Sequence, residues 1–199
     1  YKIDVQDGHV SELVQFPPVQ DFLMDVWWDN SVADWSKDGK AIFYLTQGKI
    51  YKRDLESGRE KQLYQNNQLI RLLDLSPDGQ SLVCATTNEK EATTSLLMLP
   101  VSGGEPVKLY NFQGFSGIRI VLPWTPDGKY LLFEGKLNQD NGMWRISVEG
   151  GEPEKLWQSE KEYASVNIHP EGQQIVFSTF EQVIEIWVME NFLPETKVE

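Results

Sequence analysis

Short apolar runs of three to five residues recur along the chain, and each follows a tight polar turn. Runs of this length between turn residues are typical of β-strands, whereas a helix needs a longer stretch with helical periodicity. The four runs are residues 41–45, 81–83, 130–133 and 174–177. A shorter apolar stretch precedes each turn, so each turn predicts a β-hairpin.

The four turns share a pattern of proline, acidic residue and glycine, and they occupy residues 35–40, 75–80, 124–129 and 168–173. Proline presets φ at the first central position, aspartate bonds nearby backbone, and glycine accepts positive φ. Two copies depart from the pattern, because Lys37 replaces proline and Glu171 replaces aspartate. Both replacements are expected to keep the turn. The glycines are 40, 49 and 44 residues apart, which matches a four-stranded blade.

A second set of turns lies between the first and keeps the same period. Its aligned glycines are 50, 46 and 47 residues apart. A leucine follows each of them by five residues, and a large apolar residue precedes each by seven. Because two independent turns stay in phase, the sequence predicts an all-β fold, a β-propeller of four-stranded antiparallel blades.

The order of the turns predicts three complete blades and two partial ones. The expected bounds are a partial blade at 1–15, blades at about 31–65, 70–112 and 118–158, a partial blade at 164–193 and a tail at 194–199. An isolated half-blade is marginal in water, and a propeller closes to protect its edges. We therefore expect a single propeller region that is the C-terminal part of a larger ring beginning upstream. Closure of the first outer strands on the last blade, in a ring of about five blades, is the alternative.

These motifs resemble the TolB-type propeller repeat, the bacterial Pro-Asp relative of the WD-type repeat. The resemblance rests on the Ser-Pro-Asp-Gly turn before an apolar strand and on Gly-Gly-Glu-Pro-x-Lys-Leu at 103–109 and 150–156, and it covers essentially the whole chain. It implies a bacterial propeller in the periplasm or otherwise outside the cytoplasm, attached to an upstream domain such as a regulator. A cytoplasmic location stays open. Likeness of fold does not by itself give function.

Charge and composition narrow the possible partners. The formal net charge is −12, and an acidic domain repels phosphate backbones, so this region is not expected to bind nucleic acid. No apolar stretch reaches the roughly 18 residues that a membrane helix needs, so no membrane segment is expected in this chain. Cys84, the one cysteine, stands in an apolar run and predicts a buried core thiol.

Catalytic and metal-binding patterns are missing from the sequence. The nearest approach to a nucleophile elbow, residues 114–117, lacks the required spacing. The two histidines, His9 and His169, fall in separate turns, and no zinc spacing is present. Asn141-Gly142 favours a hairpin turn rather than part of a calcium loop. We therefore expect no enzymatic activity, no metal and no cofactor.

The candidate binding surface is the loop face, where the connections between blades lie opposite the Pro-Asp-Gly turns. The first connection is about ten residues longer than its short counterparts and mixes aromatic with acidic side chains, as recognition surfaces do. Its candidate ligand-binding residues are Trp27, Trp28, Asp29 and Asn30. Alternatively, the apolar residues of this connection cap a core or line the joint with a further blade.

Four more candidates lie toward the other connections of the same face. They are Arg71, Phe115, Arg119 and Tyr163. A cationic and aromatic ring at the mouth of the channel suits an acidic peptide end or a sugar. The alternative is that these side chains plug the channel.

The sequence thus favours a non-catalytic binding or scaffold module that recognises a protein segment or a small ligand through its loop face, as the sensory domain of a larger bacterial regulator would. A rigid propeller holds its loops in place, so binding costs little ordering. The alternative is the accessory propeller of a prolyl-oligopeptidase-like serine peptidase, whose catalytic domain would lie outside this chain.

Overall fold

The computed structural model describes residues 2–3, 6–7, 9–12, 33–88, 90–113, 123–137, 140–158 and 162–180. Over these ranges the chain folds into β-strands and tight turns. None of the described residues lies in a helix, so this part of the chain contains no helix that could cross a membrane. The strands are β1 (Lys2–Ile3), β2 (Val10–Ser11), β3 (Ala33–Trp35), β4 (Ala41–Thr46), β5 (Lys49–Asp54), β6 (Glu60–Gln65), β7 (Leu69–Leu75), β8 (Ser81–Asn88), β9 (Thr93–Pro100), β10 (Val107–Gln113), β11 (Tyr130–Leu137), β12 (Asp140–Ser147), β13 (Glu154–Gln158), β14 (Glu162–Ile168) and β15 (Ile175–Phe180).

Strands that are consecutive in the sequence pair with one another in antiparallel sheets. β3 to β6 form one four-stranded sheet, and β7 to β10 form the next. β11 to β13 form a three-stranded sheet, which Trp124 extends inward through a single bridge to Leu131. β1 with β2 and β14 with β15 form ribbons of two strands each. This order is that of propeller blades, so the predicted fold class is confirmed.

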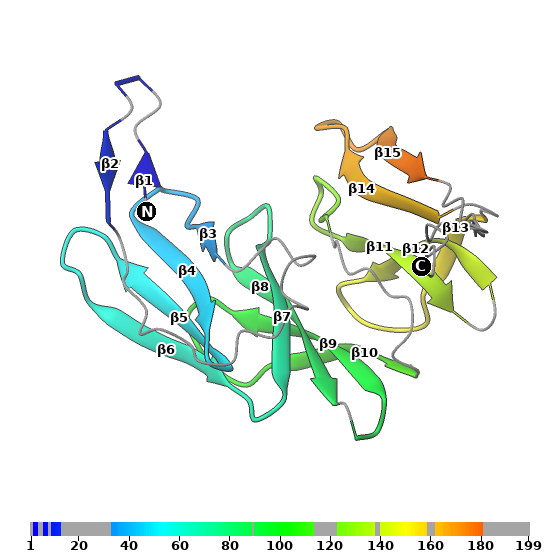
Figure 1. Cartoon of the computed structure of the whole chain (residues 1–199), viewed down its shortest axis with the longest axis horizontal. Coiled ribbons are helices and arrows are strands. Elements are labelled where there is room, and N and C mark those ends of the chain that lie inside the picture. The colour runs from blue at the N-terminus through cyan, green and yellow to red at the C-terminus, as the bar shows by residue number, and fades with distance from the viewer. Residues whose placement is uncertain are drawn as a thin grey trace, which may run out of the picture.

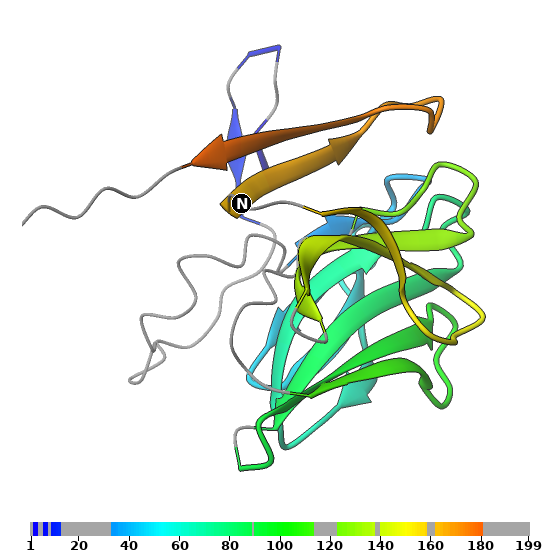
Figure 2. The same ribbon diagram turned by 90° about the vertical axis from the view of Figure 1, so that its right-hand side faces the viewer.

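The sheets follow one another in chain order along an arc. In Figure 1 the arc runs from β1 and β2 at the upper left, through β7 to β10 at the bottom, to β14 and β15 at the upper right. The β14–β15 ribbon lies above the β11–β13 sheet there and in the turned view of Figure 2. Val166 of that ribbon packs against Leu132 and Met143, so these neighbours share apolar contacts.

The Pro-Asp-Gly turn closes each inner hairpin with one repeated set of backbone bonds. In the turn between β7 and β8 the Ser76 N–H donates to the Ser81 carbonyl, and the Gly79 N–H donates to the Ser76 carbonyl, both at 2.8 Å. Gly79 has a φ of 76°, which only glycine adopts without strain. The same two backbone bonds recur in the turns that begin at Ser36, Thr125 and His169.

Side chains reinforce these turns. The Ser76 hydroxyl donates to Asp78 Oδ1 at 2.6 Å and accepts the Ser81 N–H at 2.9 Å, while Asp78 Oδ1 also accepts the Gln80 N–H at 2.9 Å. The bond from Ser76 is the main reason that the pKa of Asp78 lies below its usual value. In the turn that carries Glu171, His169 Nδ1 accepts the Glu171 N–H at 3.2 Å instead. His169 is therefore an exposed turn residue, as its position predicts.

Removing the Ser76 hydroxyl should weaken its hairpin. Ser76 is buried, and alanine would leave both the Ser81 N–H and the Asp78 carboxylate without the partner they have now. We expect Ser76→Ala to lower the free energy of unfolding by about 1–2 kcal/mol in urea titrations. Ser76→Thr is the matched control, because Thr125 makes the same contacts in its own turn. Equal stability of the alanine and threonine variants would contradict this role.

Apolar cores fill the space between neighbouring sheets. Phe43, Ile50 and Leu63 of the first four-stranded sheet pack against β7, β8 and β9. The next core joins Phe112 of β10 to Phe133 of β11, whose rings meet edge to face with centroids 5.1 Å apart. Side chains thus hold the sheets together as interlocking layers.

Cys84 belongs to the core between the two four-stranded sheets. The residue is fully buried, and burial raises the pKa of its thiol to about 12. A thiol with so high a pKa carries almost no thiolate at neutral pH and behaves as a small apolar group. The predicted core role of Cys84 is confirmed.

An acidic pair joins the inner strands β3 and β7 of the two four-stranded sheets. The Asp34 carboxylate accepts the N–H of Leu75 at 2.9 Å and that of Trp35 at 2.7 Å. The Asp74 carboxyl bonds to the Asp34 side chain, and its burial, followed by the negative charge of Asp34, raises the pKa of Asp74 from 3.8 to about 7. Below neutral pH, Asp74 is therefore the protonated member of the pair. It bonds to the Asp34 carboxylate, which already accepts two backbone N–H groups.

The predicted turn at Asn141-Gly142 is wrong. Both residues lie inside β12, where Asn141 pairs with Lys136 and Gly142 with Gly135 of β11. Glycine is needed at position 142 for another reason, because a Cβ there would run into the backbone carbonyl of Trp157 in β13. The glycine therefore allows close approach of an adjacent strand rather than a turn.

Candidate functional site

A groove runs between β6, the outer strand of one four-stranded sheet, and the strands β9 and β10 of the next. Its volume is about 350 Å³. It reaches the β6–β7 connection and the β8–β9 hairpin, which lie on the loop face, opposite the Pro-Asp-Gly turns. The residues that line this loop-face groove are Tyr64, Asn66, Gln68, Thr86, Glu91, Thr93, Ser95, Leu97, Pro106, Lys108 and Asn111.

One wall of the loop-face groove is a row of polar side chains on three adjacent strands. The register places Ser95 of β9 between Thr86 of β8 and Asn111 of β10. The Ser95 hydroxyl donates to the Asn111 amide oxygen at 2.8 Å. Among the described residues no group accepts from the Asn111 amide NH₂, so this donor is available to a ligand. The next cross-strand pair on the same face is Cys84 with Leu97, both buried, and it gives the polar row an apolar base.

The opposite wall is the β6–β7 connection, which its own hydrogen bonds hold in place. The Asn66 side chain donates to the Tyr64 hydroxyl at 2.8 Å and accepts the Gln68 N–H at 3.0 Å. The Asn66 N–H donates to the carbonyl of Gly48 at 3.0 Å. Burial raises the pKa of Tyr64, so its hydroxyl stays protonated at neutral pH. These bonds fix the wall before any ligand arrives, which lowers the entropy cost of binding.

A further contact ties the same two sheets together at their outer turns. Lys61 of β6 reaches across and donates from Nζ to the Ser102 carbonyl at 2.6 Å. Ser102 lies in the turn between β9 and β10. The Lys61 bond and the packing of the buried Leu63 against β7 to β9 hold β6 against the neighbouring sheet.

The loop-face groove is polar but nearly neutral. Its charged lining residues are Glu91 and Lys108, both exposed, and the other polar ones carry hydroxyl or amide groups. Within the described ranges no group of three or more His, Cys, Asp or Glu residues could hold a metal ion. Hydroxyls and amides at these positions can pair with the N–H and C=O groups of a peptide or with sugar hydroxyls.

The eight residues predicted from the sequence are not brought together in the described structure. Trp27, Trp28, Asp29, Asn30, Phe115 and Arg119 lie outside the described residues. Arg71 is the third residue of β7, opposite Ala85, and Tyr163 is the second residue of β14, opposite Thr179. The binding roles of all eight stay predictions.

The polar row was missed because it depends on register. Thr86, Ser95 and Asn111 stand 9 and 16 residues apart in the sequence, and only the pairing of three strands makes them neighbours. One signal was available, since each is a polar residue within a strand that is otherwise largely apolar. Asn66 and Gln68, in a connection of the predicted face, could have been found from their position alone.

Sequence comparison gives a distant likeness. No protein-family model matches the chain. An uncharacterised protein of Agrobacterium fabrum is 22% identical over 180 residues, which cover 86% of this chain and 59% of that protein. The chain therefore spans less than two thirds of the length of this curated relative.

Solved structures give a likeness of fold. TolB from Acinetobacter baumannii superposes with a TM-score of 0.58 at 20% identity, over 75% of this chain and 37% of that one. The β-propeller domain of the trilobed protease from Pyrococcus furiosus gives 0.53 at 18% identity, over 75% of this chain and 48% of that one. The chain thus has the TolB-type β-propeller fold that its repeats predicted.

Proposed function

We propose that this chain, with its TolB-type propeller fold, is a non-catalytic module that binds an extended protein segment in the loop-face groove. The observation that carries the proposal is the polar row Thr86, Ser95 and Asn111 facing the fixed wall at Asn66. An extended peptide offers an N–H or a C=O at every step, and such a row can meet several of them at once.

Neutrality and preorganisation support a peptide as the ligand. The groups that line the groove are mostly uncharged, so they suit backbone amides better than a phosphate or a nucleic acid. Asn66 and Lys61 hold one wall by hydrogen bonds that exist without a ligand. Binding then costs mainly the ordering of the peptide itself. A small polar ligand such as a sugar is the second possible occupant.

The test begins with selection from a random heptapeptide library displayed on phage, using the immobilised chain. The selected peptide is then titrated against Asn111→Leu, which replaces a half-buried amide of the groove by an apolar group. We expect about a tenfold loss of affinity by calorimetry, because one satisfied polar contact is worth about 1–2 kcal/mol. Gln80→Leu, a change from amide to leucine in an exposed turn on the opposite face, should leave the affinity unchanged.

Equal binding by the Asn111→Leu and Gln80→Leu variants would contradict the groove as the site. A second outcome is that no peptide is selected but an oligosaccharide binds saturably and Asn111→Leu weakens that binding. The groove would then be the binding site, but its ligand would be a sugar and not a peptide. Circular dichroism of both variants checks that the strands are intact, so a loss of binding is read only on folded protein.

The second candidate is the accessory propeller of a serine peptidase. It is favoured by the likeness to the propeller domain of the trilobed protease. The coding sequence upstream of Tyr1 separates the two proposals. A hydrolase domain there would support the peptidase, whereas a membrane helix preceded by a regulator would support a sensory module outside the cytoplasm.

A further inference from the structure

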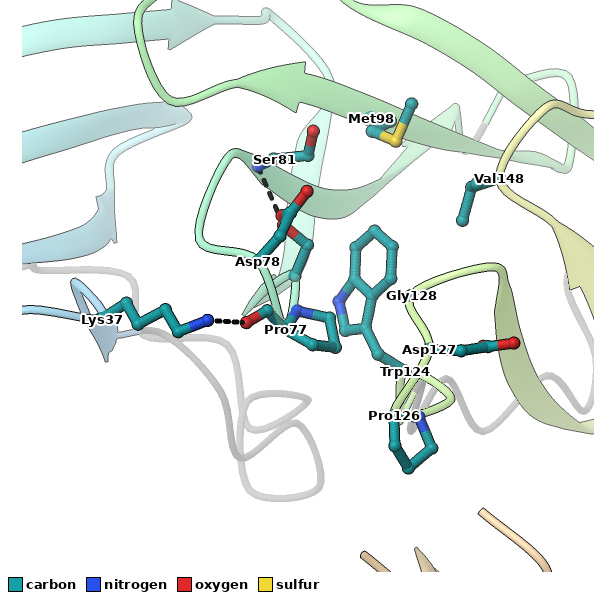
Figure 3. Close-up of a pocket in the computed structure, with 11 residues that line it drawn as sticks. Lys37, Pro77, Asp78, Ser81, Met98, Trp124, Pro126, Asp127, Gly128 and Val148 are labelled. Atoms are coloured by element: carbon teal, nitrogen blue, oxygen red, sulfur yellow. Dashed lines mark hydrogen bonds between the residues drawn. The ribbon is translucent and has the colours of Figure 1, made fainter. Parts of the chain in front are cut away.

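A second cavity lies on the opposite face of the molecule, between the Pro-Asp-Gly turns of two neighbouring blades. Its volume is about 410 Å³. We call it the turn-face cavity and define it by Pro77, Asp78, Met98, Trp124, Asp127 and Val148. In Figure 3 the Trp124 indole lies at its centre, with Met98 and Val148 at one end and Pro77 at the other.

The two turns that border the cavity are in ordinary van der Waals contact, slightly looser than the contact between the neighbouring pairs of turns. In the repeat, each glycine lies against the residue at the proline position of the preceding turn. A Cβ built on Gly79 would stand 3.2 Å from Lys37, and one on Gly172 would stand 3.3 Å from Pro126. At the turn-face cavity the equivalent distance, from Gly128 to Pro77, is 3.9 Å. Of these three junctions between described turns, this one has the loosest contact.

Trp124 has an unmet hydrogen-bonding capacity at this site. The side chain is 9% exposed, whereas Trp35, at the same position of an earlier repeat, is 43% exposed. The indole Nε1–H of Trp124 is buried and finds no acceptor among the described residues. A buried donor without a partner costs about 1–3 kcal/mol. An acceptor supplied by a ligand would remove that cost.

Two acidic residues line the cavity together with the indole. In Figure 3 Asp78 and Asp127 lie on opposite sides of Trp124, and the Asp127 side chain points away from the ring. Each uses Oδ1 within its own turn, through bonds from Ser76 and Thr125 that lower the pKa of both acids and keep them ionised. A cation beside an indole face gains from the ring as well as from the acids.

Two lysines partly offset these acids, because Lys37 lines the cavity and favours the ionised form of Asp78, and Lys129 does the same for Asp127. Lys37 Nζ is held by the Pro77 carbonyl at 2.9 Å, at one margin of the cavity. Lys129 approaches Asp127 Oδ2 only to 4.0 Å, and its side chain is 74% exposed, so a ligand can displace it at little cost. The net charge of −12 on the whole chain adds a long-range attraction for cations.

We propose that the turn-face cavity binds a short basic peptide segment, with an arginine or lysine side chain between Asp78 and Asp127. A peptide carbonyl accepts from the Trp124 indole as the cavity adjusts around it. An apolar neighbour of the basic residue packs against Met98 and Val148. This site lies on the face opposite the loop-face groove and is independent of it.

The test follows the indole N–H signals of the ¹⁵N-labelled chain by NMR, with the Trp124 signal assigned by its loss in Trp124→Phe. The probe is acetyl-Leu-Arg-Leu-amide, and the matched probe carries citrulline, which is neutral and almost isosteric with arginine. We expect a saturable shift of the Trp124 signal with the arginine peptide and about tenfold weaker binding of the citrulline peptide.

Substitutions locate the charge. Asp127→Asn keeps a turn acceptor but removes the charge, and it should weaken binding of the arginine peptide by about tenfold. Asp38→Asn makes the same change at a carboxylate that does not line the cavity, and binding should be unchanged. An unshifted Trp124 signal, equal affinity for the two probes, or equal loss in the two variants would each overturn the proposal. Binding in the loop-face groove should survive Asp127→Asn, so failure of one site is distinguishable from failure of the other.

Discussion

Phe133→Ala is expected to lower the free energy of unfolding by about 3–5 kcal/mol, because it empties a ring-sized space in a closed core. Phe133 is 1% exposed and meets the ring of Phe112 across the junction of two sheets. Urea unfolding followed by circular dichroism measures the loss. Trp35→Ala is the control, since that tryptophan is 43% exposed and its loss should cost about 1 kcal/mol or less.

A double-mutant cycle tests whether the two sheets share this core. Phe112→Leu and Phe133→Leu each replace an aromatic ring by a smaller aliphatic side chain without emptying the site. The edge-to-face pair predicts a coupling between the two losses of unfolding free energy of about 0.5–1.5 kcal/mol. Strictly additive losses would mean that the sheets fold without this contact. Such a result would contradict the packing of consecutive blades described above.

Asp74→Asn is expected to stabilise the protein at neutral and alkaline pH. The pKa of Asp74 is raised from 3.8 to about 7, so between these values the folded state holds a proton that the unfolded state has lost. Stability therefore falls as pH rises through this window, and the penalty is complete above about pH 7. Each pH unit between the two pKa values is worth about 1.4 kcal/mol, so removal of the acid should yield a few kcal/mol at pH 8.

Thermal melts of the wild type and Asp74→Asn from pH 4 to pH 8 measure the effect. The difference in Tm should be smallest at pH 4 and grow to several degrees by pH 8. Asp38→Asn serves as the control, because the pKa of Asp38 is lowered by its turn and its loss should give no gain at high pH. A constant difference across the range would show that Asp74 and Asp34 do not share a proton.

Local chemistry explains why the repeat could be predicted. The turn at Ser76 depends on hydrogen bonds between residues at most five positions apart in the sequence. Their residue types therefore form a short motif that the sequence alone shows. The spacing of the glycines then gives the blade. Cys84 was predictable for a similar reason, because its neighbours in the sequence are apolar on both sides.

Contacts between distant strands explain what the sequence did not reveal. The polar row at Ser95 and the acid pair of Asp34 with Asp74 each depend on pairing or packing between different strands. Gly142 shows the same limit, since its role is to admit the Trp157 carbonyl of β13. A residue pair that signals a turn in one setting permits close strand packing in another.

Hydrogen exchange measured with and without a selected peptide shows directly whether the peptide binds at the loop-face groove. Binding there should slow exchange at the β6–β7 connection around Asn66 and Gln68 and at the β8–β9 hairpin, with no change at the turns around Ser36 and Ser76. Protection at those turns, with unchanged exchange at Asn66 and Gln68, would contradict it.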